Sequence, residues 1–304
     1  SFHVTGVQTC ALPICAGVLP KEGSLPFQAG IWKTTRFDIS LNHPVVMGIV
    51  NVTPDSFSNL SPSVTVRSAI EVAAALVKEG AQVIDIGGES TRPGATPLTP
   101  QEEWARVENV LKEVLRWQIP ISLDTYHPSN MQKALDLGVD IINDIWGFRQ
   151  ARALETVASY PCGLCMMHMH GEPATMQIQP IETSVMAEVT AFFSDHLTKA
   201  KAMGIDPQRM VIDPGIGFGK SVSQNFAILN AQLALLALGH PVMVGWSRKS
   251  SLGVVTGLPV HERLIPSVTA AVIALERGAC ILRVHDVAQT LAAVKVWLAS
   301  RQSA

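Results

Sequence analysis

Residues able to do chemistry recur in this sequence at the points where short apolar runs end. The run at 45–50 stops at Asn51, and the run at 119–123 stops at Asp124. Later runs stop at polar groups, and these are Asn143, His168, Asp213, Ser247, Arg283 and His285. Polar groups at the carboxyl ends of successive buried parallel strands form the active site of a (β/α)₈ barrel. The pattern therefore predicts that residues far apart in sequence meet at one end of a barrel.

Two glycine-rich loops follow runs of this kind. The segment 213–220 places three glycines around Phe218, so the backbone can approach a ligand closely beside a flat aromatic face. The segment 87–94 offers backbone donors, the Thr91 hydroxyl and the Arg92 guanidinium. Both loops have the composition of a small-molecule binding site.

Basic groups also occur at the predicted strand ends. Arg248 and Lys249 are adjacent where a crevice is expected, which favours an anion or substrate site over a solvated face. Arg283 and His285 are two residues apart on one strand, so their side chains project to the same face. Two cations on one face suit a diphosphate.

Three acids, Asp85, Asp124 and Asp213, lie at strand ends among apolar residues. Buried carboxylates need hydrogen-bond donors, so a ligand rich in N–H groups would satisfy them. No cluster of His, Cys and Asp has the spacing of a protein-held zinc site. Isolated histidines such as His127 and His196 are interpreted as surface or core residues without a binding role.

The elements that position these groups follow a regular order. Strands are predicted to begin near residues 45, 83, 121, 141, 163, 210, 241 and 281, and helices are predicted at 183–203 and 221–238. Thr99, Pro100 and Glu102 form a capping box that opens another helix. The alternation favours a single (β/α)₈ barrel over residues 34–304, with a short strand or hairpin before the first barrel strand. An open doubly wound sheet is the alternative, but no Gly-x-Gly-x-x-Gly follows the first strand.

Composition limits the class of protein further. Of 304 residues, 47% are hydrophobic and 16% charged, and the net charge is −2, so no basic surface for nucleic acid is expected. No apolar run reaches the ~18 residues of a membrane span. Five cysteines without regular spacing suggest a reduced, cytoplasmic protein, and the pair Cys162 and Cys165 is interpreted as packing. Residues 1–33 show no packing period and are expected to be a leader without function.

The motifs resemble those of dihydropteroate synthases, the pterin-binding enzyme family. Eight segments carry the resemblance in the family's order, at 47–58, 85–94, 122–125, 142–145, 167–169, 213–220, 247–250 and 283–286. The resemblance implies a transferase of folate biosynthesis that condenses 6-hydroxymethyl-7,8-dihydropterin diphosphate with 4-aminobenzoate, giving 7,8-dihydropteroate and diphosphate. It also implies a homodimer and a Mg²⁺ cofactor.

The same resemblance implies residue roles. The pterin is expected to be bound by Asp124, Asn143, Asp213, Lys249 and Arg283. The aminobenzoate is expected to be bound by Thr91, Arg92, Pro93, Phe218 and Ser250. The diphosphate is assigned to Asn51, Arg283 and His285, with Asn51 also the metal ligand. The catalytic set is Asp124, Lys249, Arg283 and His285.

Departures from the family pattern leave alternatives open. Asn59 stands where the family usually has aspartate, in a loop expected to close over the aminobenzoate, and Trp146 and Trp246 are larger than expected. The alternatives are a methyltetrahydrofolate:corrinoid methyltransferase and a non-catalytic pterin-binding barrel. Methyl transfer expels no diphosphate, which counts against the first. The sequence leaves open whether sulfonamides, which mimic aminobenzoate, act on this enzyme or are rejected.

Overall fold

The structure, a computed structural model, describes residues 25–53, 62–91, 95–171, 181 and 184–302. Its central feature is a closed parallel barrel in the order β10-β3-β4-β5-β6-β7-β8-β9. The barrel strands are β3 Val45–Asn51, β4 Val83–Gly87, β5 Ile121–Asp124, β6 Ile141–Asp144, β7 Gly163–Met167, β8 Met210–Asp213, β9 Val242–Val244 and β10 Ala279–Val284. The predicted (β/α)₈ barrel is thus confirmed. Only two strand starts differ, since β9 begins one residue later and β10 two residues earlier than predicted.

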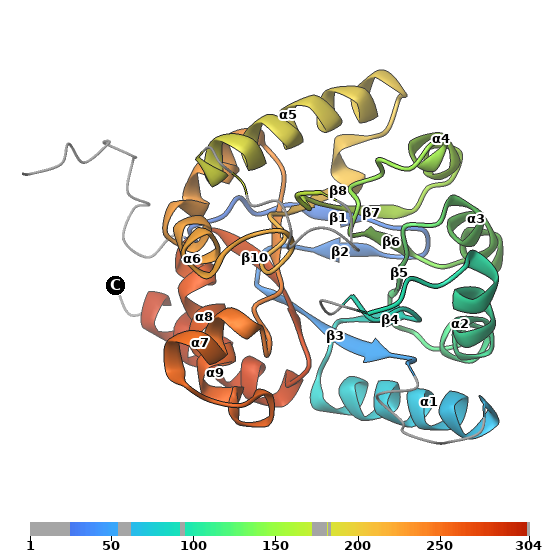
Figure 1. Ribbon diagram of the computed structural model, residues 1–304, viewed down its shortest axis with the longest axis horizontal. Coiled ribbons are helices and arrows are strands. Elements are labelled where there is room, and N and C mark those ends of the chain that lie inside the picture. The colour runs from blue at the N-terminus through green and yellow to red at the C-terminus, as the bar shows by residue number, and fades with distance from the viewer. Residues whose placement is uncertain (1–24, 54–61, 92–94, 172–180, 182–183, 303–304) are drawn as a thin grey trace, which may run out of the picture.

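Helices surround the strands in a ring (Figure 1). They are α1 Pro62–Glu79, α2 Pro100–Val114, α3 Pro128–Leu137, α4 Ala153–Ala158, α5 Val185–Ala202, α6 Val222–Ala231, α7 Ser250–Thr256, α8 Leu264–Glu276 and α9 Val287–Gln302, with short 3₁₀ turns η2 Pro207–Arg209, η3 Gln232–Leu238 and η4 Val260–Glu262. The predicted capping box opens α2, where the Thr99 hydroxyl accepts from the Glu102 backbone N–H at 3.2 Å. None of the helices in the described part of the chain is long and apolar enough to cross a membrane.

One helix differs from the sequence expectation. The predicted helix at 221–238 is α-helical only as far as Ala231 and continues as the 3₁₀ turn η3. At the junction, the buried Gln232 side chain donates to the backbone carbonyls of Ala274 and Arg277, both at 2.9 Å. These contacts connect η3 with the end of α8, a tertiary interaction that the local apolar pattern could not predict.

An antiparallel hairpin, β1 Ile31–Lys33 and β2 Asp38–Ser40, lies at the amino end of the barrel. Trp32 is fully buried there, and its indole N–H donates to the Arg209 carbonyl at 3.0 Å. Phe27 is also buried and stacks on Trp297. The predicted boundary between residues 33 and 34 therefore divides the hairpin, and the packed unit begins earlier than expected. Residues 1–24 of the predicted leader lie outside the described residues.

The hairpin is joined to the barrel by an ion pair at the amino end of β6. Arg36 approaches Asp140 to 2.7 Å, and the Arg36 guanidinium also donates to the carbonyls of Leu115 and Ile119 at 2.8 and 3.2 Å. The Asp140 carboxylate in turn accepts from the Ile121 backbone N–H at 2.8 Å. Each polar group in this cluster has a protein partner, so the cluster needs no ligand.

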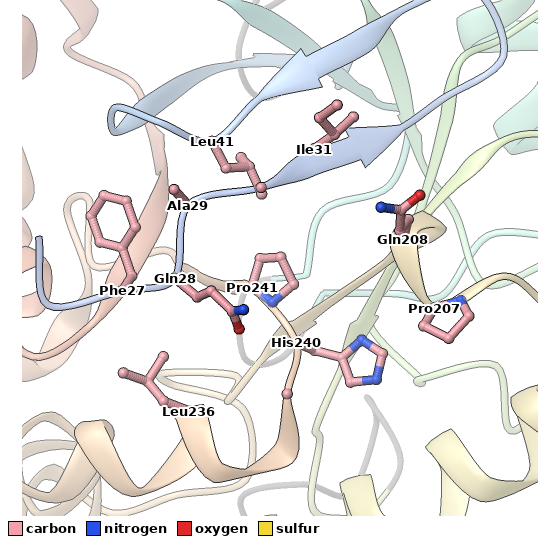
Figure 2. Close-up of a pocket in the computed structure, with 12 residues that line it drawn as sticks. Phe27, Gln28, Ala29, Ile31, Leu41, Pro207, Gln208, Leu236, His240 and Pro241 are labelled. Atoms are coloured by element: carbon pink, nitrogen blue, oxygen red, sulfur yellow. The ribbon is translucent and has the colours of Figure 1, made fainter.

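A cavity of about 350 Å³ lies between this hairpin and the start of β9 (Figure 2). Among the residues that surround it are Phe27, Ile31, Leu41, Leu236 and His240, together with two glutamine side chains. Among the described residues that line this cavity, none carries a charged side chain. It lies at the amino ends of the strands, whereas (β/α)₈ enzymes hold their chemistry at the carboxyl ends.

Candidate active site

A second pocket lies at the carboxyl ends of the barrel strands. Its lining consists of Thr91, Asp124, Asn143, Ile145, Met167, Asp213, Gly215, Ile216, Phe218, Gly245, Lys249 and Arg283. Seven predicted site residues are in this group, although they come from six different strands or the loops after them. The barrel thus brings together polar groups from residue 91 to residue 283, as the strand-end pattern predicted.

Of the remaining predicted residues, those that the structure describes are not part of this lining. Asn51 ends β3, which pairs directly with β10, the strand of Arg283. Ser250 is exposed at the first turn of α7. Arg92 and Pro93 lie outside the described residues, as does Asn59.

Arg283 spans the strand ends as a bridge between two acids. Its Nε donates to Asp85 Oδ2 at 2.7 Å and its NH2 group donates to Asp124 Oδ2 at 3.0 Å. The Asn143 amide donates to the same Asp85 oxygen at 3.2 Å. The other Asp85 oxygen is buried and has no hydrogen-bond partner. Asp85 was predicted as a buried acid but not as the anchor of Arg283.

Burial perturbs the protonation of the acids in this pocket. It raises the pKa of Asp124, against the opposing effect of the Arg283 guanidinium. Burial also raises the pKa of Asp213, whose Oδ1 accepts the Gly215 backbone N–H at 2.7 Å. Carboxyl groups with raised pKa in a cleft are typical of functional sites. Because a buried carboxylate is costly without donors, both acids favour a ligand that supplies them.

Lys249 is the second basic group of the pocket. Its Nζ lies 4.3 Å from the centre of the Phe218 ring, in a cation–π arrangement. Burial lowers the pKa of Lys249 to about 8; the nearby Arg283 also lowers it, and Asp213 opposes this. A lysine in this environment stays largely protonated at neutral pH and can donate to a ring acceptor.

The loop that carries Phe218 is fixed by the buried Lys220. The Lys220 ammonium donates to the carbonyls of Gly215, Phe218 and His168 at 2.8, 3.0 and 3.2 Å. Gly215 has a φ of +71°, and a Cβ there would lie 1.8 Å from the His168 carbonyl oxygen. The loop after β8 is therefore tied to the loop after β7 with no room for a side chain between them.

His285 differs in charge from the sequence expectation. Burial, together with the nearby Arg248 and Arg283, lowers its pKa to about 3, so the imidazole is neutral rather than a second cation. Its Nδ1 lies 2.9 Å from the Ser247 hydroxyl, which also accepts the His285 backbone N–H at 3.1 Å. This Ser247 contact was not predicted, because it joins residues 38 positions apart.

The two unexpected tryptophans pack beside the pocket rather than lining it. Trp246 is buried and lies against Phe226, with ring centroids 5.3 Å apart. Trp146 stacks on Tyr126 at 5.2 Å and packs against a small apolar cluster that includes Phe218. Neither tryptophan therefore narrows the pocket: Trp246 packs against Phe226, and Trp146 packs against the apolar cluster that includes Phe218.

Comparison with known proteins places this geometry in one family. Residues 47–285 match the pterin binding enzyme family. Dihydropteroate synthase of Neisseria meningitidis serogroup B is 48% identical over 274 residues, covering 88% of this chain and 96% of that protein. The chain belongs to the dihydropteroate synthase family. It is a transferase of folate synthesis that condenses the pterin diphosphate with 4-aminobenzoate.

Solved structures agree with this assignment. The chain is similar to Burkholderia cenocepacia dihydropteroate synthase complexed with 7,8-dihydropteroate, with a TM-score of 0.82 and 42% identity over 91% of this chain and 98% of that one. It is also similar to the Yersinia pestis dihydropteroate synthase in a sulfonamide drug complex, with a TM-score of 0.85 and 38% identity over 90% of this chain and all of that one. The methyltransferase and non-catalytic alternatives receive no support from these relatives.

Proposed function

We propose that the condensation takes place in the pocket at the carboxyl ends of the strands. The observation that carries this proposal is the convergence of the buried Asp213 with the half-buried Asp124, Lys249 and Arg283, groups of both signs whose hydrogen-bonding capacity is only partly used. The pterin ring would lie against Arg283. Its N–H edge would donate to the carboxylates and to Asn143, and Lys249 would donate to a ring acceptor.

The reaction would proceed by departure of the diphosphate. The C–O bond breaks, the electron pair leaves with diphosphate, and the electron-rich pterin stabilises the cation that remains. The aminobenzoate nitrogen then forms the C–N bond and loses a proton. No side chain is required as a nucleophile, so catalysis rests on positioning and on stabilising the departing charge. Arg283 would bind the phosphate oxygens, and the neutral His285 would donate a hydrogen bond.

Mg²⁺ fits the end of β3. The Asn51 Oδ1 and Asp124 Oδ2 atoms both lie 3.7 Å from the point where a side chain on Gly87 would begin. The absence of that side chain leaves two oxygens facing one space, and hard cations prefer oxygen ligands. Asn51 would hold the ion, which when bound neutralises part of the diphosphate charge. Because Asn51 is a neutral ligand, tight binding would depend on the diphosphate.

The aminobenzoate would lie between Phe218 and Thr91, which face the same pocket. Phe218 offers an apolar wall, and Lys249 above its ring offers a positive charge for the carboxylate. Sulfonamides that mimic aminobenzoate would compete here. The similarity to the sulfonamide-bound Yersinia pestis enzyme supports this competition. Ser250 and the loop containing Arg92 and Pro93 would complete the site.

The test is a coupled measurement on the purified enzyme. With both substrates and Mg²⁺, formation of dihydropteroate and diphosphate in equal amounts is expected. Arg283→Ala should weaken diphosphate affinity about 10- to 100-fold, in line with a charge-assisted bond worth ~1.5–3 kcal/mol. Arg283→Lys keeps the charge and should lose less. Full turnover in the presence of a chelator would contradict the role given to Mg²⁺.

The assembly proposed is a homodimer formed through α7, η4 and α8. Large apolar side chains are exposed on these consecutive elements: Val254 68%, Val255 57%, Val260 46% and Ile265 77%. Exposed apolar groups concentrated on one stretch are typical of protein interfaces. Light scattering should show a dimer that Ile265→Lys converts to a monomer, and a wild-type monomer at micromolar concentration would exclude the proposed dimer.

A cytoplasmic location is proposed as well, since the three described cysteines are buried free thiols.

A further inference from the structure

Beside the pocket, three side chains that sequence spacing had not connected come together. Glu89 follows β4, Glu103 lies on α2, and His127 precedes the first turn of α3. One ligand atom from each lies within 4.8 Å of the other two. The His127 Nε2 atom is 4.0 Å from Glu89 Oε2. The sequence spacing did not predict this set of two carboxylates and one imidazole.

The two carboxylates are oriented, but no lysine or arginine is paired with either in the described part of the chain. Glu103 Oε2 accepts from the Thr125 hydroxyl at 2.7 Å and from the Asn130 amide at 2.6 Å. Glu89 accepts from the Tyr126 hydroxyl at 2.7 Å and from a backbone N–H. Neutral donors hold both groups in place without neutralising them. Two negative charges this close require a proton or a cation between them.

Burial strengthens the need for a proton or a cation between the two carboxylates. Glu103 is only 1% exposed, and burial raises its pKa to about 7, an effect that the neighbouring Glu89 increases. Arg106 is near enough to oppose the shift, but its guanidinium donates to the Gly88 carbonyl. A cation bound at Glu103 would offset this cost of burial.

His127 supplies the observation that points to a metal rather than to a proton alone. The residue is 9% exposed, and its Nε2 atom is buried without a hydrogen-bond partner while facing Glu89. Burial lowers the pKa of His127, so the ring is neutral and one ring nitrogen keeps its lone pair. A neutral imidazole is the form that ligates transition metals. The initial interpretation of His127 as a residue without a binding role is therefore revised.

We infer that Glu89, Glu103 and His127 form a binding site for a divalent transition metal of the Zn²⁺ type, separate from the Mg²⁺ of the reaction. Zinc takes three such protein ligands with a water in the fourth position, whereas magnesium selects oxygen ligands. Ligand atoms around tetrahedral zinc lie about 3.3 Å apart, so these atoms, all within 4.8 Å of one another, would need to close by at most about 1.5 Å. The ion would fix Glu89, which lies two residues before Thr91 of the pocket.

Zinc binding to the whole chain, without substrates, tests the inference independently of the proposed reaction mechanism. Titration calorimetry with Zn²⁺ alone should show about one equivalent bound per chain at micromolar or tighter affinity. Co²⁺ in its place should give the intense visible absorption of a four-coordinate ion. His127→Gln and Glu103→Gln should each weaken binding at least tenfold. His170→Gln is the matched control, since His170 also pairs with a glutamate, Glu188, at 2.7 Å, and it should bind as the wild type does.

Absence of binding at tens of micromolar zinc, or wild-type zinc affinity in His127→Gln, would show that these three residues do not form a metal site. Glu103→Gln removes a buried group, so its fold is checked by circular dichroism. If this variant is unfolded, His127→Gln alone decides, because its Nε2 atom makes no hydrogen bond that the substitution would break. A protein that binds zinc but does not condense the substrates would leave this inference standing and remove the proposed mechanism.

Discussion

The two ends of the barrel each hold an arginine beside buried aspartate, yet the two clusters differ in how completely they are satisfied. At the amino end, Arg36 and Asp140 use their hydrogen-bonding groups on each other and on nearby backbone. At the carboxyl end, Arg283 is shared between Asp85 and Asp124, and one Asp85 oxygen has no partner.

This difference distinguishes a structural ion pair from a binding site. A buried pair with all partners in place is part of the fold, and removing one member leaves an uncompensated charge. A cluster with unused donors and acceptors has a free-energy cost that a ligand can offset. Cavity size alone does not identify the active site, since the larger of these two cavities lies at the amino end of the barrel and none of its described lining residues is charged.

The largest effect is expected at the amino end. Asp140→Ala should lower the free energy of unfolding by about 3–5 kcal/mol, because it leaves the Arg36 guanidinium without its partner. Chemical denaturation of the purified variant measures this. Asp206→Ala is the control, since Asp206 pairs with Lys33 on the surface with both side chains 43% exposed and should change little. Comparable stability for the two variants would show that the Arg36–Asp140 pair is not a structural ion pair of the kind argued above.

At the carboxyl end the effect should fall on turnover instead. Lys249→Met removes a charge whose burial is unfavourable, so stability should stay the same or rise. Turnover should fall about 100-fold, equivalent to ~2.7 kcal/mol of lost substrate and transition-state interaction. Steady-state kinetics and a thermal melt on the same preparation give both values. A variant that loses stability and keeps its activity would show that Lys249 serves the fold.

The pH dependence sharpens the comparison. Lys249 has a pKa lowered to about 8, so it loses its proton as pH rises through 8. Pterin affinity should therefore decline about tenfold between pH 7 and pH 9. The sign for stability is opposite: the unfolded lysine holds its proton more tightly, so the contribution of Lys249 to stability rises over that range. Calorimetry on Lys249→Arg, which stays charged, should not show this decline.

A smaller effect is expected from the contact behind His285. Ser247→Ala removes the hydroxyl at Nδ1 and should lower kcat about 3- to 10-fold, consistent with one hydrogen bond of ~0.5–1.5 kcal/mol. The KM for aminobenzoate should not change. Ser247→Thr keeps the hydroxyl and should recover most of kcat. An unchanged kcat in Ser247→Ala would remove Ser247 as a positioning residue.

The smallest effect is expected from removing residues 1–24, and a longer truncation serves as the contrast. Deleting residues 1–24 should leave the melting temperature unchanged, because that segment has no packing period. Deleting residues 1–33 should destabilise the protein by several kcal/mol, since it removes Phe27 and the fully buried Trp32. Melting curves of the two truncations test the claim directly. A lower melting temperature for the shorter deletion would show that the leader contributes to the fold.

The strand ends were predictable because buried parallel strands have continuous apolar runs and stop at polar residues. Asp124, Asn143 and Asp213 come together as that pattern indicated. The sharing of Arg283 between two acids was not predictable, because its partners lie 198 and 159 residues away.

The charge states of the site residues also could not be predicted from the sequence. His285 was expected to be a cation from its residue type, but burial beside two arginines lowers its pKa, so the ring is neutral. The set of Glu89, Glu103 and His127 has no recognisable ligand spacing, because its members come from three different elements that only the barrel places together. Local pattern thus predicts which positions face the site, whereas protonation and ligand sets depend on three-dimensional packing.

The packing of the loop after β8 has a consequence for how this enzyme can change under drug selection. At Gly215 and Gly219 any side chain would meet a backbone carbonyl, at 1.8 and 2.4 Å, and both residues have positive φ. Single substitutions that change the shape of the aminobenzoate site without unfolding the loop are therefore not expected at these two positions. Substitutions that reshape this wall are expected instead at pocket residues that already carry a side chain, such as Thr91.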